Sequence, residues 1–119
     1  MRNFREYEVW KKAISFTKKI YILTNDFPAN EKYGIISQIQ RASVSISSNI
    51  AEGCSRFSEK DFARFIEISL GSSYETENLI IISLELNFIN EHKYNELIQE
   101  IQIIQKQLSA LYSILTKSK

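Results

Sequence analysis

Five polar residues recur along one side of the segment between residues 38 and 52. At about 100° per residue in a helix, they fall within an arc of about 80°: Gln38, Arg41, Ser45, Asn49 and Glu52. Such side chains form hydrogen bonds of fixed geometry, whereas a solvated helix face is usually built from Lys and Glu. The stripe is either an internal polar network that fixes helix register or a surface that binds a ligand. The network is the commoner role, because buried polar groups are normally hydrogen-bonded.

Basic side chains in and after this stripe could bind an anion. A guanidinium group donates two parallel hydrogen bonds to a phosphate or a carboxylate. The candidate contacts to an anion or a nucleic acid are Arg41, Arg56, Lys60 and Arg64. Arg56 is the better candidate, because it lies beyond the expected end of the helix and close to Lys60 and Arg64.

The residue types that most often carry catalysis or bind metal are few and isolated. The only histidine, His92, lies between Glu91 and Lys93, and Ile89 stands where a di-iron bundle would need a glutamate. The only cysteine, Cys54, has no histidine near it in the sequence, so a buried or idle thiol is the simpler interpretation. There is no glycine-rich phosphate loop. We predict no catalytic residue, no metal site, no cofactor and hence no enzyme.

Helices must position these side chains. With 3 Gly and 1 Pro in 119 residues, the chain has too few turn residues for a sheet protein. Apolar residues recur at spacings of three and four in the segments 7–24, 30–50, 58–87 and 91–115. Short links make such helices antiparallel. We therefore expect an all-α fold, an antiparallel up-down-up-down four-helix bundle, as a single domain over residues 1–119.

Each segment has an expected core face and expected ends. The faces are Tyr7, Trp10, Ile14, Thr17, Tyr21 and Thr24 in the first segment; Ile35, Ile39, Ala42, Ile46 and Ile50 in the second; Phe62, Phe65, Ile66, Ser73, Thr76, Ile80 and Leu84 in the third; and Tyr94, Leu97, Ile101, Ile104, Leu108, Leu111 and Leu115 in the fourth. Asn30 and Ser58 are expected N-caps. Gly53 stands where a left-handed residue commonly ends a helix, and Gly71 predicts a close approach of two helices.

Two segments carry apolar residues away from their expected core faces. These residues are Ile68, Leu79, Ile82 and Leu86 in the third segment and Ile103, Ala110 and Ile114 in the fourth. A helix on the surface of a monomer normally has one apolar stripe and one polar face. We therefore predict a subunit interface at Ile68, Leu79, Ile82, Leu86, Ile103 and Ile114, with a wide core contact as the alternative.

Charge and composition limit the compartment and the partners. The net charge is +1, but residues 1–60 hold ten Lys or Arg against six Asp or Glu, and residues 61–119 hold five against eight. The front half could offer a polyanion a local patch, without the strongly basic balance of a dedicated nucleic-acid module. A single cysteine suits a reducing compartment, no signal segment is evident, and the most apolar stretch, 79–89, is too short to span a bilayer. We predict a cytoplasmic protein that does not contact membranes.

The central run also carries a family resemblance. Arg41–Gly53, followed by Arg56 and Ser58, resembles the signature of the bacterial four-helix-bundle proteins first noticed as reading frames in intervening sequences of 23S rRNA genes. The flanking matches are Val9–Ala13, Phe27–Pro28, Glu31–Gly34, Gly71–Ser72 and Glu75. The similarity covers nearly the whole chain.

The resemblance implies an assembly and a class of partner. It implies ring-like homopentamers of four-helix subunits and no catalytic activity. Relatives include the accessory protein of diversity-generating retroelements, which works with a reverse transcriptase and binds nucleic acid on a basic barrel. Those relatives are markedly basic, whereas this chain is nearly neutral.

Two hypotheses about function follow. The first is a non-catalytic homo-oligomeric scaffold, a pentamer, that binds RNA or a nucleic-acid-handling protein through basic residues. The alternative is a protein–protein interaction oligomer with no affinity for nucleic acid. The two differ in salt dependence, because binding driven by phosphate contacts weakens steeply as salt rises.

Overall fold

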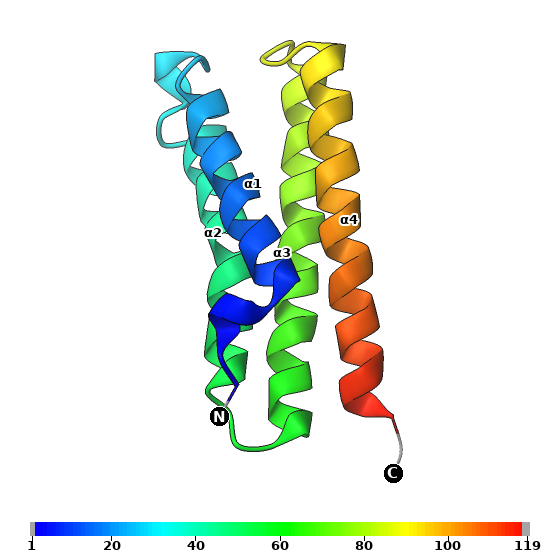
Figure 1. The fold of residues 1–119 in the computed structure, drawn as a ribbon. Coiled ribbons are helices and arrows are strands. Elements are labelled where there is room, and N and C mark those ends of the chain that lie inside the picture. The colour runs from blue at the N-terminus through cyan, green and yellow to red at the C-terminus, as the bar shows by residue number, and fades with distance from the viewer. Residues whose placement is uncertain (1, 118–119) are drawn as a thin grey trace.

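Four long helices dominate the computed structural model, which describes residues 2–117. They are α1 (Glu8–Thr24), α2 (Ile35–Cys54), α3 (Glu59–Glu85) and α4 (Glu91–Thr116), with 3-10 turns η1 (Phe4–Glu6) before α1 and η2 (Ala29–Glu31) before α2. Successive helices run in opposite directions (Figure 1). Helix α1 contacts α2 and α4 but not α3, so α1 and α3 occupy diagonal corners. The expected antiparallel four-helix bundle is confirmed.

Local hydrogen bonds fix the ends of α3 and the start of α4. The Ser58 side chain accepts from the Asp61 amide, as expected of an N-cap, and the Asn90 side chain accepts from Lys93. Helix α3 ends at Glu85, and Asn87, two residues later, is a left-handed residue with φ 62°. The amide after it, that of Phe88, donates to the Ser83 carbonyl at 2.9 Å. Asparagine tolerates this conformation better than most residues.

The core follows the predicted stripes in α2 and α4. All five predicted positions of α2, Ile35 to Ile50, are buried, and so are Leu97, Ile101, Ile104 and Leu108 of α4. Burial of each large aliphatic side chain contributes about 1.5–3 kcal/mol. No helix among the described residues combines the length and apolarity needed to cross a bilayer.

The predicted core face of α1 is wrong at Ile14 and Tyr21, whereas Thr24 is buried and Tyr7 and Trp10 pack against the core. The buried residues are Val9, Ala13, Phe16, Ile20 and Thr24. Ile14 and Tyr21 are exposed instead. Two stripes with helical spacing lie side by side on this helix, and only contact with α2 and α4 decides between them. The expected cap at Asn30 is also wrong, because α2 begins at Ile35 after η2.

The two helical glycines have roles opposite to those predicted. Gly53 does not end α2 in a left-handed conformation; it lies inside the helix, and no described glycine has a positive φ. A Cβ on Gly53 would lie 2.8 Å from Cβ of Phe65 and 2.9 Å from Cδ1 of Phe62. A Cβ on Gly71 would meet nothing within 4 Å. The close approach of helices α2 and α3 is therefore at Gly53, not at Gly71.

Replacement of Gly71 by alanine should stabilise the protein. Alanine favours the helix over glycine by about 1 kcal/mol, and the added methyl group enters open space. We expect Gly71→Ala to raise the free energy of unfolding by 0.5–1 kcal/mol, roughly. Urea denaturation followed by circular dichroism measures this change. A lower midpoint would contradict the open surroundings of Gly71.

Candidate functional site

The middle of the polar stripe is an internal network between α2 and α3. The Asn49 amide nitrogen Nδ2 donates to the Ser45 carbonyl at 2.8 Å and to its hydroxyl at 2.9 Å. The Ser72 hydroxyl of α3 donates to the Ser45 hydroxyl at 2.9 Å. These half-buried groups therefore hold α2 against α3.

The start of the stripe, by contrast, is open to solvent. Gln38 and Arg41 are exposed, and they line a shallow hollow with Ala42, Ser45 and Glu75. Among the described residues, neither Gln38 nor Arg41 has a side-chain hydrogen bond or ion pair to the protein. Glu52, at the other end of the stripe, pairs with Arg56 and not with Asn49. One stripe in the sequence thus becomes three separate environments.

Substitution of Arg41 tests this division. Arg41→Ala should change the free energy of unfolding by less than about 0.5 kcal/mol, because surface substitutions without partners are nearly neutral. Asn49→Ala is the comparison on the same helix. It should cost 1–2 kcal/mol, roughly, because it removes two hydrogen bonds from a half-buried network. Equal losses for the two variants in thermal or urea denaturation would contradict the division.

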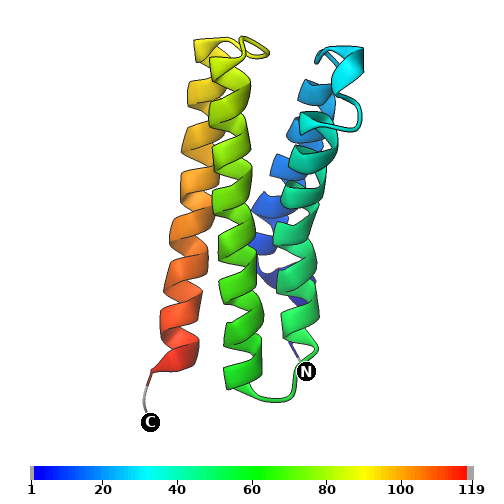
Figure 2. The same cartoon turned by 180° about the vertical axis from the view of Figure 1, so that it is seen from behind.

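A second group of side chains, here called the basic end, gathers where α2 leads into α3. It comprises Arg2, Arg56, Lys60 and Arg64 with Phe57 and Phe65. The start of the described chain, the α2–α3 link and the end of α4 lie at this same end of the bundle (Figures 1 and 2). Arg2 Nη1 donates to the Arg56 carbonyl at 2.7 Å, and its guanidinium carbon lies 4.5 Å from the centre of the Phe62 ring.

Aromatic rings position the cations of the basic end. The guanidinium carbons of Arg56 and Arg64 lie 4.5 Å and 5.5 Å from the centre of the Phe65 ring. Cation–π contacts of this kind orient a guanidinium without neutralising its charge. Arg56 also pairs with Glu52 at 3.3 Å. No carboxylate of the described residues forms an ion pair with Arg2, Lys60 or Arg64.

The basic end includes three of the four predicted cationic contacts. Arg56, Lys60 and Arg64 lie together, and Lys60 and Arg64 share a hollow with Lys117 from the end of α4. Arg41 lies elsewhere, roughly 20 Å away along α2 at 1.5 Å per residue. Arg2, Phe57 and Phe65 were not among the predicted site residues. The available signal for Phe57 was its position directly after Arg56, between two predicted helices.

The residues with reactive side chains remain isolated. Cys54 is buried, and burial raises the pKa of its thiol, which the positive charge of Arg2 partly opposes. Burial, and after it the neighbouring Cys54, raises the pKa of Tyr7, and the positive charge of Arg2 partly opposes this shift. His92 is exposed in the first turn of α4. Within residues 2–117 no cluster of His, Cys, Asp or Glu is arranged to hold a metal ion.

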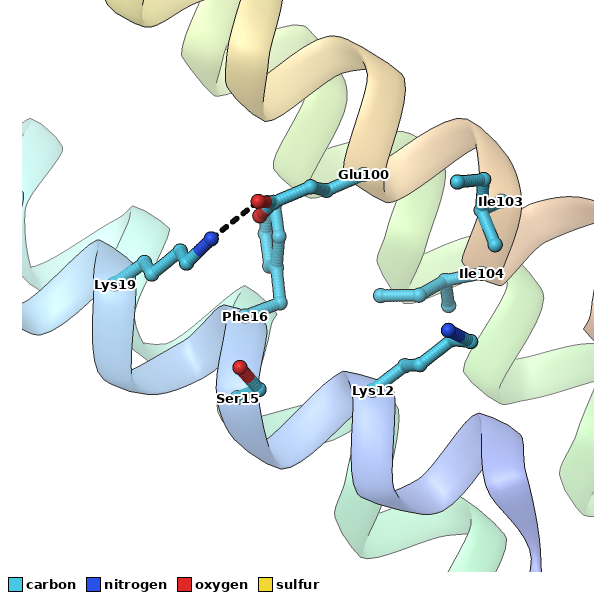
Figure 3. Close-up of a pocket in the computed structure, with 7 residues that line it drawn as sticks. All are labelled: Lys12, Ser15, Phe16, Lys19, Glu100, Ile103 and Ile104. Atoms are coloured by element: carbon cyan, nitrogen blue, oxygen red, sulfur yellow. Dashed lines mark hydrogen bonds and ion pairs between the residues drawn. The ribbon is translucent and has the colours of Figure 1, made fainter.

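A groove between α1 and α4 forms the third feature. Figure 3 shows the residues that line it: Lys12, Ser15, Phe16, Lys19, Glu100, Ile103 and Ile104. The Lys19 ammonium donates to Glu100 across the groove, and this hydrogen bond raises the pKa of Lys19. Lys12 has no ion pair among the described residues. Ile103 is exposed beside the groove.

Five of the six residues predicted for a subunit interface are exposed. They are Ile68, Ile82 and Leu86 on α3, called here the α3 strip, and Ile103 and Ile114 on α4. Leu79 is a correction, because it is 5% exposed and packs in the core of the subunit. Leu79 follows Ser72 by two helical turns, so it lies on the side of α3 that faces α2, between the strip and the core face.

The comparisons with known proteins agree with this fold. A family model described as "23S rRNA-intervening sequence protein" matches residues 5–110. A solved structure from Bacteroides thetaiotaomicron, described as a protein with unknown function from the S23 ribosomal protein family, is 25% identical with a TM-score of 0.82. The match covers 88% of this chain and 95% of that one. No curated protein matches. Neither description names a catalytic activity.

Proposed function

This chain belongs to the 23S rRNA-intervening sequence protein family, and on that premise we propose that it is a non-catalytic homo-oligomeric scaffold that binds RNA. The subunits form a closed ring of five, the number that the resemblance of the sequence implies. The basic end of each subunit contacts the RNA.

The observation that carries the proposal is a pair of opposite surfaces with apolar side chains and complementary charge. The α3 strip exposes Ile68, Ile82 and Leu86. Beyond Arg64, the charged residues of α3 are all acidic: Glu67, Glu75, Glu77 and Glu85. Helix α1 carries four lysines against one glutamate, and Lys12 and Lys19 line the α1–α4 groove beside Ile103. Complementary potentials steer two such surfaces together.

The diagonal positions of α1 and α3 determine the kind of assembly that results. Because the two surfaces lie on different corners of one subunit, the α3 strip of one copy meets the α1–α4 groove of the next. Such a head-to-tail contact closes into a ring when the rotation between neighbours allows it. Cyclic symmetry then places all copies of the basic end in one plane, where a single RNA strand contacts several of them.

The RNA-binding part of the proposal rests on the basic end. Lysine and arginine side chains without carboxylate partners are the groups that neutralise phosphates. Arg2, Lys60 and Arg64 meet this description within the described part of the chain. Phe57 and Phe65 add the aromatic rings that nucleic-acid-binding proteins place among such cations.

Two measurements test the proposal. Sedimentation at micromolar concentration should show a closed oligomer, and a monomer would overturn the scaffold. Labelled single-stranded RNA should be retained at low salt, with an affinity that falls steeply as salt is raised. If the oligomer forms but retains no RNA at low salt, the alternative applies, a protein–protein interaction oligomer without affinity for nucleic acid.

A further inference from the structure

The most exposed large apolar side chain of the basic end is Phe57. It is 98% exposed, in the short link between α2 and α3. A phenylalanine held in water contributes nothing to the core. Its ring is therefore free to stack on a partner.

The link holds Phe57 in a fixed place. On one side, the Ser55 hydroxyl donates to the Glu52 carbonyl at 2.6 Å, and the Arg56 amide donates to the Gly53 carbonyl at 3.1 Å. On the other side, the Ser58 hydroxyl caps α3 through the Asp61 amide at 3.1 Å. Only Phe57 itself lies between these two fixed points, so its ring is presented with little freedom of the backbone.

Cations lie on both sides of Phe57 in the sequence. Arg56 precedes Phe57, and its guanidinium rests on Phe65 together with that of Arg64. Lys60 and Arg64 lie one turn apart on α3 and line the same hollow, which Asp61, Glu67 and Lys117 also line. The arrangement combines an exposed aromatic face with cations that can reach the phosphates on either side of a base.

We propose that Phe57 stacks on an unpaired base while Arg64 and Lys60 bind the adjacent phosphates. This inference rests on the proposed RNA-binding function and names the substrate class, single-stranded RNA. In a duplex both faces of each base are already stacked, so only the phosphate contacts remain. An acidic peptide could likewise occupy the cations but would offer no base for Phe57.

The experiment compares Phe57→Ala with the wild type in fluorescence anisotropy with a labelled 12-nucleotide single strand and the matching RNA duplex. Removal of one stacking contact should weaken single-strand binding about 5- to 150-fold and leave duplex binding unchanged. Arg64→Ala should weaken binding of the single strand and of the duplex. It should also reduce the salt dependence of binding by the amount expected for about one phosphate contact. Equal sedimentation of variant and wild type shows that assembly is intact.

Tyr33→Ala is the matched control. Tyr33 is 88% exposed, has Lys32 over its ring at 5.5 Å, and lies at the other end of α2, about 30 Å away. Its removal should leave binding unchanged. Two outcomes would overturn the stacking inference while RNA binding stands. The first is that Phe57→Ala binds the single strand as tightly as the wild type does. The second is that polyglutamate displaces the single strand equally well from the wild type and from Phe57→Ala. If the wild type binds no RNA at low salt, the proposed function fails and the inference with it.

Discussion

Gly53→Ala should destabilise the protein by about 1–2 kcal/mol, although alanine is the better helix former. The added Cβ would lie 2.8 Å from Cβ of Phe65, an atom fixed to the backbone of α3. Relief therefore requires α2 and α3 to separate, and overpacking of this kind typically costs about 1–3 kcal/mol. Gly53→Leu should lower the free energy of unfolding by about 3 kcal/mol or more, because the larger side chain meets the same residues of α3.

Gly71→Ala is the matched control for this effect. Both substitutions add one methyl group to a glycine inside a helix, so they share the gain in helix propensity. Their difference in urea midpoint, measured at one protein concentration, isolates the contact with Phe62 and Phe65. A stable Gly53→Ala protein would show that the two helices separate at little cost.

The second large effect concerns assembly, which we expect Ile82→Glu to disrupt. Ile82 is 38% exposed on the α3 strip, and an unpaired glutamate buried against the next subunit costs several kcal/mol. We expect the subunit dissociation constant to rise at least about 100-fold, equivalent to about 2.7 kcal/mol. Helicity should remain, because the side chain is already partly in solvent. Analytical ultracentrifugation together with circular dichroism separates dissociation from unfolding.

Ile81→Glu provides the comparison for Ile82→Glu. Ile81 is 40% exposed on the same helix, but it points about 100° away from Ile82. The same charge at the same exposure should therefore leave the oligomer intact. Dissociation of both variants to the same degree would show that the α3 strip is not the interface.

Only the part of the candidate site whose residues lie close together along the chain could be predicted from the sequence. Arg56, Lys60 and Arg64 are near neighbours in the sequence, so their proximity could be predicted from helical spacing. Arg2 joins them through a hydrogen bond to a residue 54 positions later, which no local pattern indicates. The ring of Phe65 was assigned to the core, yet it is half-buried and supports two guanidinium groups.

The sequence by itself determined the features that depend on neighbours within one or two helical turns. These are the four helices, the buried stripe of α2, the heptad of α4 and the cap at Ser58. Local spacing and local hydrogen bonds suffice for each of them. The tertiary structure decided which of two stripes on α1 is buried, which glycine touches a neighbouring helix and why Leu79 belongs to the core. Each of these depends on where a second helix lies, and that position is set by the packing of all four helices together.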